Sequence, residues 1–143
     1  MAAVEQARWE HFPHGADIGV RGIAPTKRGA FEQAALALTA IVIQPESLEP
    51  REVVEIVCDA PDDELLLIDW LNALIYEMAT RRMLFARFDV ALDGTQLTAR
   101  AWGQPIDSES QELTVEPKGA TYTALSVRQL DDGRWCAECV VDV

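Results

Sequence analysis

The spacing of apolar residues along this chain alternates between a strand period and a helix period, and the order of these changes limits the fold. Residues 16–24 alternate with period two, which predicts a strand. Apolar residues then recur at helical spacing over residues 31–42, and residues 52–58 form a short β-branched strand. Residues 65–82 carry the strongest helical pattern, after an acidic start suited to the positive end of a helix dipole.

The rest of the chain predicts two hairpins. Asp93-Gly94 separates two strand-like segments, because Asp-Gly readily adopts the positive φ that tight hairpin turns need. Asp131-Asp132-Gly133 separates two more, over residues 120–130 and 135–143. The order strand, helix, strand, helix, hairpin, hairpin predicts an α+β fold of two layers, with two main helices on one face of a mixed or antiparallel sheet. A chain of 143 residues suits one domain, 1–143, with residues 1–10 expected as a loosely ordered N-terminus.

The charge of the chain excludes several classes of function. Twelve Lys and Arg against twenty-four Asp and Glu give a net charge of −12. Phosphate backbones and anionic lipids are bound chiefly by Lys and Arg, so neither direct high-affinity nucleic-acid binding nor membrane docking is expected. Cations, basic protein partners and neutral ligands stay open. The N-terminus lacks the pattern of a signal peptide and the cysteine count is odd, so we expect a cytoplasmic protein.

Three features invite a functional interpretation. Cys136 and Cys139 have the spacing of half a zinc site or a redox pair, but in a strand they would point to opposite faces, which favours two structural residues. The only histidines, His11 and His14, are candidates for acid–base or metal chemistry, yet no nucleophile motif accompanies them, so no catalytic residue is predicted. The polar segment 103–118 is the best candidate for a mobile or functional loop.

Two aspartates stand in apolar strands, where Asp is disfavoured. Asp17 lies early in the first predicted strand, and Asp142 lies in the last one, next to the terminal carboxylate of Val143. Three carboxylates are hard oxygen ligands of the kind that Ca²⁺ or Mg²⁺ prefers. The alternative is that both aspartates simply face the solvent, and the spacing alone does not separate the two interpretations.

Several segments, in order along the chain, resemble one family. The string His14-Gly-Ala-Asp-Ile-Gly-Val20 resembles the HTADIG opening of the archease proteins. The other similar segments are residues 31–36 of the first predicted helix, Asp69-Trp-Leu-Asn72 and Met83-Leu-Phe85 of the second helix and its exit, Lys118-Gly-Ala-Thr-Tyr122, Trp135 and the closing Asp142-Val143. The resemblance therefore runs from about residue 11 to the last residue.

Archeases are small accessory proteins of the RtcB-type, GTP-dependent RNA ligase. The resemblance implies that this chain promotes guanylylation and multiple turnover of such a ligase in tRNA splicing or RNA repair, and that it is not itself the enzyme. It also implies a divalent-cation site at Asp17, Asp142 and the carboxylate of Val143, with Ca²⁺ as the expected ion and Mg²⁺ or Mn²⁺ as alternatives. His14 is a candidate accessory residue. The alternative functions are a stand-alone metal-dependent phosphoester- or nucleotide-processing enzyme and a chaperone-like interaction module.

This chain departs from the family pattern at four positions. Gly15 replaces a Thr, Gly119 replaces an Ala, Thr123 stands where a His is often found, and Gln111 lies in a loop where a His is common. A contribution of histidines from the later region is therefore not expected, whereas both aspartates are intact.

Overall fold

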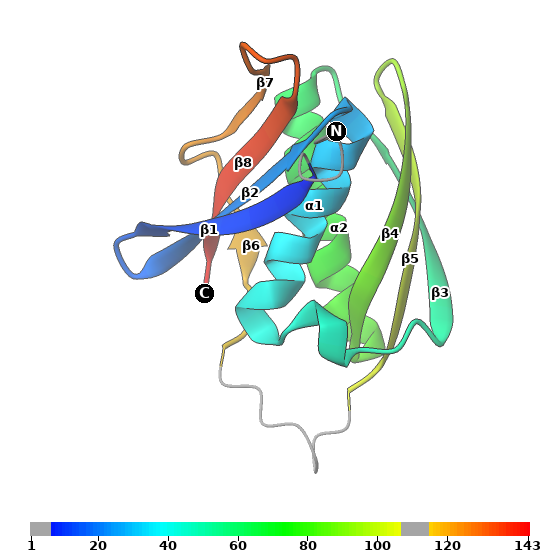
Figure 1. The fold of residues 1–143 in the computed structure, drawn as a ribbon. Helices are drawn as coiled ribbons and strands as arrows, with labels where there is room; N and C mark the ends of the chain where they lie inside the picture. Colours follow the sequence, from blue (N-terminus) through cyan, green and yellow to red (C-terminus); the bar gives the residue numbers. More distant parts are fainter. Residues whose placement is uncertain (1–6, 107–114) are drawn as a thin grey trace.

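The computed structural model describes residues 7–106 and 115–143 (Figure 1). In chain order its elements are β1 (Arg8–His14), β2 (Asp17–Ala24), α1 (Lys27–Val42), the short 3-10 helix η2 (Pro45–Ser47), β3 (Glu52–Asp59), α2 (Asp63–Arg81), β4 (Met83–Asp93), β5 (Gln96–Pro105), β6 (Gly119–Ala120), β7 (Ser126–Gln129) and β8 (Trp135–Asp142). The predicted α+β class with two main helices is confirmed.

The strands form two antiparallel sheets. The first sheet has the order β1-β2-β8-β6, with β7 also paired to β8, and the second has the order β3-β5-β4. Figure 1 shows α1 and α2 between these sheets, so strands cover the helices on both sides and the fold has one layer more than the predicted two. The two predicted hairpins are both present, but β4–β5 belongs to the second sheet and β7–β8 to the first. The order of elements along the chain does not predict this division.

Helix α1 is built to be covered on both sides. Its buried residues extend around more than half of the helix, and they are Ala30, Phe31, Ala34, Ala35, Ala37, Leu38, Thr39 and Ile41. Small residues let the strands approach closely: a methyl group added at Gly22 of β2 would overlap the backbone of α1. On the other side, the hydroxyl of Thr39 donates to the carbonyl of Phe85 in β4 at 2.6 Å. Thr26 caps the start of the helix, because its side chain accepts a hydrogen bond from the amide of Gly29.

Helix α2 packs against α1 through one large side chain. Trp70 is fully buried, and its indole N–H donates to the carbonyl of Phe31 at 3.0 Å. The helix begins at the N-cap Asp62 and ends at Arg82, which has a left-handed backbone. In the part of the chain that the structure describes, no helix is both long and apolar enough to cross a membrane.

A side chain of α1 also protects an edge of the second sheet. The carboxylate of Glu32 accepts a hydrogen bond of 2.9 Å from the amide of Val90 in β4, the outermost strand on that side. Burial raises the pKa of Glu32, and the hydrogen bond from Val90 opposes that shift. The bond ties α1 to the second sheet.

Three segments differ from their predicted form. Residues 8–10, expected in a loose N-terminus, begin β1; the prediction missed this strand because its inward positions carry Trp9 and His11 rather than aliphatic residues. The expected strand over residues 120–130 is divided into β6 and β7, where Ala124 has a φ of 54°. The expected loop over residues 103–118 is shorter at its start, because β5 continues to Pro105, and residues 107–114 lie outside the described residues.

Candidate functional site

The predicted aspartates lie on the outer face of the first sheet, the face turned away from α1. Gly22 faces α1, so Arg21, Gly19 and Asp17 point outward by the alternation of a strand. In the register of β2 and β8, Gly19 lies opposite Val140, and Asp142 follows two residues later on the same face. The structure therefore places Asp17 and Asp142 on one face at neighbouring strand ends.

The last residue of the chain joins Asp17 directly. The amide of Val143 donates to the Oδ1 atom of Asp17 at 3.3 Å. On the other side of β8, the amide of Lys118 donates to the carbonyl of Asp142 at 2.8 Å. We call Asp17, Asp142 and Val143 the carboxylate end. Its last two residues are held from both sides by these two bonds.

The charge of the carboxylate end is not balanced by neighbouring cations. Within residues 7–106 and 115–143, neither Asp17 nor Asp142 forms an ion pair. Asp17 is half-buried and Asp142 is exposed. Like charges on one sheet face repel each other, so this end would gain stability from a bound cation.

The donor set fits a hard cation only if Val143 takes part. Among the described residues, no group of three His, Cys, Asp or Glu side chains could hold a metal ion. Asp17 and Asp142 provide two carboxylates, and the hydrogen bond to Asp17 brings Val143, whose oxygens would complete the set, to the same end. All of these atoms are oxygens, which suits Ca²⁺ or Mg²⁺ better than a soft metal.

The two histidines have different surroundings. His11 points toward α1, where its Nε2 atom lies 2.7 Å from the carbonyl of Ala37, and its ring lies against Trp9 at a centroid distance of 5.1 Å. His11 therefore helps to pack β1 against the helix. His14 is exposed at the end of β1, directly opposite Asp17 in the register. Only His14 is placed next to the carboxylate end.

The cysteines are separated as the strand period predicts. Cys136 lies opposite Ile23 on the outer face, and Cys139 lies opposite Val20 on the face toward α1. Burial raises the pKa of Cys136 to about 11 and that of Cys139 to about 12. Both thiols are therefore protonated at neutral pH and point to opposite faces, so they form neither a redox pair nor half of a zinc site.

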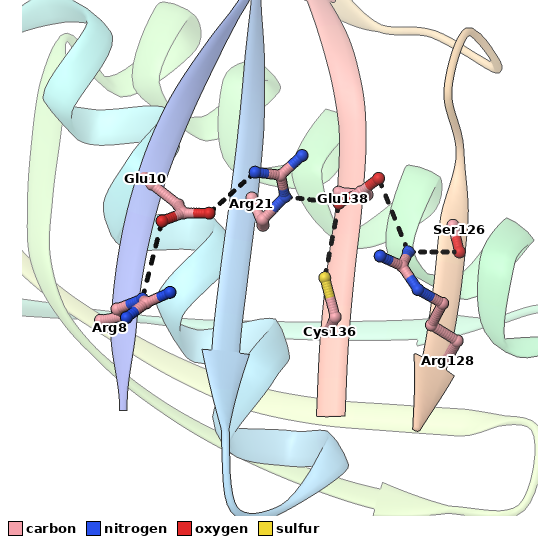
Figure 2. Close-up of polar contacts among 7 residues, drawn as sticks. All are labelled: Arg8, Glu10, Arg21, Ser126, Arg128, Cys136 and Glu138. Atoms are coloured by element: carbon pink, nitrogen blue, oxygen red, sulfur yellow. Dashed lines mark hydrogen bonds and ion pairs between the residues drawn. The ribbon is translucent and has the colours of Figure 1, made fainter. Parts of the chain in front are cut away.

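The outer face also carries a row of alternating charges that the sequence interpretation missed. Figure 2 shows this row, which runs across β1, β2, β8 and β7 through Arg8, Glu10, Arg21, Glu138 and Arg128. We call these five residues the charge ladder. No local motif predicts it, because its central partners Arg21 and Glu138 are 117 positions apart and the sequence pattern does not predict β1. Once the register is known, Glu10 lies opposite Arg21, and Arg21 opposite Glu138.

Arg21 is the centre of the charge ladder. It binds Glu138 at 2.6 Å and Glu10 at 2.8 Å, while Arg128 lies 3.6 Å from Glu138. The hydrogen bond to Glu10 is the main cause that raises the pKa of Arg21, and it outweighs burial. Burial alone would raise the pKa of Glu138, but the hydrogen bond and charge of Arg21 lower it overall. The ladder is thus a set of matched charges that connects four strands.

One aromatic side chain separates the two charged regions. The ring of Phe12 lies over Gly19, where an added methyl group would overlap the ring. The guanidinium of Arg21 lies 4.7 Å from the centroid of the same ring. Phe12 thus lies between the charge ladder and the carboxylate end on the outer face.

The departures from the resemblance have simple structural settings. Gly15 has a φ of +61° in the turn between β1 and β2, a backbone conformation that glycine adopts readily. A methyl group at Gly119 would lie 3.7 Å from the Oδ1 atom of Asn72, which is ordinary contact, so this position also accepts alanine. Thr123 contributes its backbone carbonyl, which accepts from the amide of Val140 at 3.0 Å. Gln111 lies outside the described residues.

Comparisons with known proteins agree on one family. Residues 9–143 match the model of the archease protein family (MTH1598/TM1083). Protein archease of Pyrococcus abyssi is 36% identical over 140 residues, which cover 95% of this chain and 99% of the relative. Protein archease of Thermococcus gammatolerans is 37% identical with the same coverage of both chains.

Solved structures agree as well. The solution structure of Methanobacterium thermoautotrophicum protein 1598 has a TM-score of 0.83 at 29% identity, covering 94% of this chain and 98% of that one. A Thermotoga maritima crystal structure described as an archease and possible chaperone has a TM-score of 0.56 at 19% identity, covering 94% of this chain and 96% of that one. The second likeness concerns the fold alone.

Proposed function

The chain belongs to the archease family, and from this premise we propose that it is an accessory protein that activates an RtcB-type RNA ligase. It promotes guanylylation of the ligase and supports repeated turnover, in tRNA splicing or RNA repair, and it is not the catalyst itself. The observation that carries the proposal is the carboxylate end. There the bond between Val143 and Asp17 joins the first and the last of the segments that resemble the archease family.

The carboxylate end is proposed to hold a divalent cation, with Ca²⁺ as the first choice and Mg²⁺ or Mn²⁺ as alternatives. Asp17 and Asp142 would bind it together with Val143, and the exposed His14 is the accessory side chain on the neighbouring strand. A bound cation supplies positive charge toward the phosphate groups of guanylyl transfer. The protein contributes the fixed positions of its carboxylates at one edge of the first sheet.

The charge of the whole chain supports an interaction with a basic enzyme rather than with RNA. A net charge of −12 attracts a positively charged cleft over distances of roughly 10 Å at moderate salt. Acidic surfaces repel the RNA backbone directly. The proposed partner is therefore the ligase that holds the RNA, in the cytoplasm.

The test is a guanylylation assay with the cognate ligase, GTP and a divalent cation. Wild-type protein is expected to accelerate ligase guanylylation, and Asp17→Asn and Asp142→Asn are expected to lose most of this acceleration. Asp131→Asn is the matched control, because it removes the same charge in the exposed turn between β7 and β8, away from the carboxylate end. No acceleration by the wild type would refute the activation proposal, and full activity of both variants would refute the role of the carboxylate end.

The same preparations separate the alternative functions. Hydrolysis of phosphoesters or nucleotides by the chain alone, lost in Asp17→Asn, would favour a stand-alone enzyme. Protection of a misfolding client without any effect on guanylylation would favour a chaperone-like module, the description given to the Thermotoga maritima relative. The activation proposal requires that the effect depend on the ligase.

A further inference from the structure

A side chain of α2 holds the strand beside the carboxylate end. The Oδ1 atom of Asn72 accepts a hydrogen bond of 2.8 Å from the amide of Ala120 in β6. These residues are 48 positions apart, and the side chain of Asn72 has no other role in the core because the residue is exposed. The bond joins the helical layer to the edge of the first sheet.

Strand β6 depends on this bond more than a longer strand would. It has only two residues, and strands this short contribute little stability on their own. The amides of Lys118 and Thr121 donate to the carbonyls of Asp142 and Val140 in β8, at 2.8 and 3.0 Å. The amide of Ala120 instead points to α2, where only a side-chain acceptor satisfies it.

Strand β6 in turn fixes the end of the chain. Gly119 lies opposite Asp142 in the register, and the bond from Lys118 holds the carbonyl of Asp142. Residues at the end of a chain fray unless something ties them down, and repulsion between Asp17 and Asp142 favours fraying here. Asp17 holds the end from β2, and β6 holds it from the other side.

We propose that Asn72 is a positioning residue of the carboxylate end: it fastens β6 to α2 and thereby keeps Asp142 and Val143 in place for a cation. This inference rests on the proposed function, because it assumes that a cation binds there. Groups that orient metal ligands from outside the ligand set typically contribute ~10–100-fold to metal affinity. Asn72 acts through the backbone of β6 rather than by contact with the ion.

The experiment compares Ca²⁺ binding by calorimetry in wild type, Asn72→Ala and Asn72→Asp. Asn72→Ala is expected to bind Ca²⁺ at least ~10-fold more weakly. Asn72→Asp keeps an acceptor oxygen for the amide of Ala120 and is expected to bind within about threefold of wild type. Thr80→Ala is the control, since its hydroxyl donates within α2, to the carbonyl of Tyr76.

Amide hydrogen exchange in Ca²⁺-free protein supplies a second readout. Asn72→Ala should speed the exchange of Lys118, Ala120 and Val143 by ~10-fold or more and leave β5, the central strand of the second sheet, unchanged. Unchanged Ca²⁺ affinity in Asn72→Ala, unchanged exchange at Lys118 and Val143, or failure of Asn72→Asp to retain binding would each overturn the inference.

The outcomes also separate this inference from the proposed function. If wild type binds Ca²⁺ and activates the ligase while Asn72→Ala does both equally well, the inference fails and the proposed function stands. If wild type binds no divalent cation, both the inference and the proposed cation site fail, and the guanylylation assay alone decides on ligase activation.

Discussion

The two ends of the outer face of the first sheet use charge in opposite ways. In the charge ladder, each carboxylate is matched by an arginine, and Arg21 alone serves Glu10 and Glu138. At the carboxylate end, Asp17 and Asp142 share a face with no ion-pair partner among the described residues. The ladder stabilises the fold through ion pairs, whereas the two aspartates of the carboxylate end have no such partner among the described residues, and we propose that a cation takes that place.

The largest expected effect comes from removing the centre of the ladder. Arg21→Met would leave two part-buried carboxylates without their main partner, and only 12% of the Glu138 side chain is exposed. We expect the free energy of unfolding to fall by about 3 kcal/mol, measured by urea denaturation. Arg8→Met should change it by less than about 0.5 kcal/mol, because that side chain is 54% exposed. Equal effects of the two substitutions would contradict the ladder as described.

A smaller loss is expected between the two ends. Gly19→Ala would push the ring of Phe12 away from β2 and disturb its contact with Arg21. The cost should be about 1.5 kcal/mol in urea denaturation, the range usual for overpacking. The variant Phe12→Ala combined with Gly19→Ala should show less than the sum of the single effects, since the overlap is then removed. Strict additivity would show that Phe12 and Gly19 do not interact.

The acid side of the stability curve tests the pairing of Glu138. Its pKa is lowered in the folded protein, so its contribution is present above the ordinary glutamate pKa and is lost as the pH falls through the lowered folded value. Glu138→Gln should therefore be less stable than wild type near pH 7 by about 1 kcal/mol. The difference should shrink as the pH falls below about 4.3, the ordinary pKa of Glu. A difference independent of pH would mean that the charge of Glu138 contributes nothing.

The smallest expected effect has the opposite sign. Asp142→Asn at the carboxylate end should raise stability in Ca²⁺-free buffer by about 0.5 kcal/mol, because it removes a like charge beside Asp17. From the proposed cation site we expect CaCl₂ to raise the melting temperature of wild type, and the same variant should lose that increase. Asp131→Asn again serves as the control. If Asp142→Asn instead lowers stability without Ca²⁺, the charge of Asp142 is stabilising, as the charges of the ladder are, and it is not repelled by Asp17.

Much of the fold could be predicted because its signals are local. The caps at Thr26 and Asp62 and the turns at Gly94 and Gly133 depend on residues within a few positions of each other. The division into two sheets could not be predicted, since strand pairing over long sequence distances has no local signal. The wide buried surface of α1, with its many alanines, is consistent with a helix covered on two sides, but it does not predict which strands cover it.

The candidate site also has one part that the sequence predicts and another that it does not. The sequence singles out Asp17 and Asp142 because charged residues are unusual in apolar strands, and the structure places them on one face of the first sheet. Their role as cation ligands stays a proposal. The charge ladder was missed because its members look like ordinary solvent-facing charges until the register of β1, β2 and β8 is known. In the sequence, Asn72 is only part of a segment that resembles the archease family, and its bond to Ala120 follows from the fold.

The pairing of β2 with β8 has a consequence for the order in which the protein is made. Ile18 lies opposite Val141, so β2, near the beginning of the chain, can complete its pairing only when β8, at the end of the chain, has been made. During synthesis, the second sheet and both helices emerge before β8, and the edge of β2 that pairs with β8 stays unpaired until then. The carboxylate end therefore forms last, and a chain truncated before β8 would lack the strand that pairs with β2, β6 and β7.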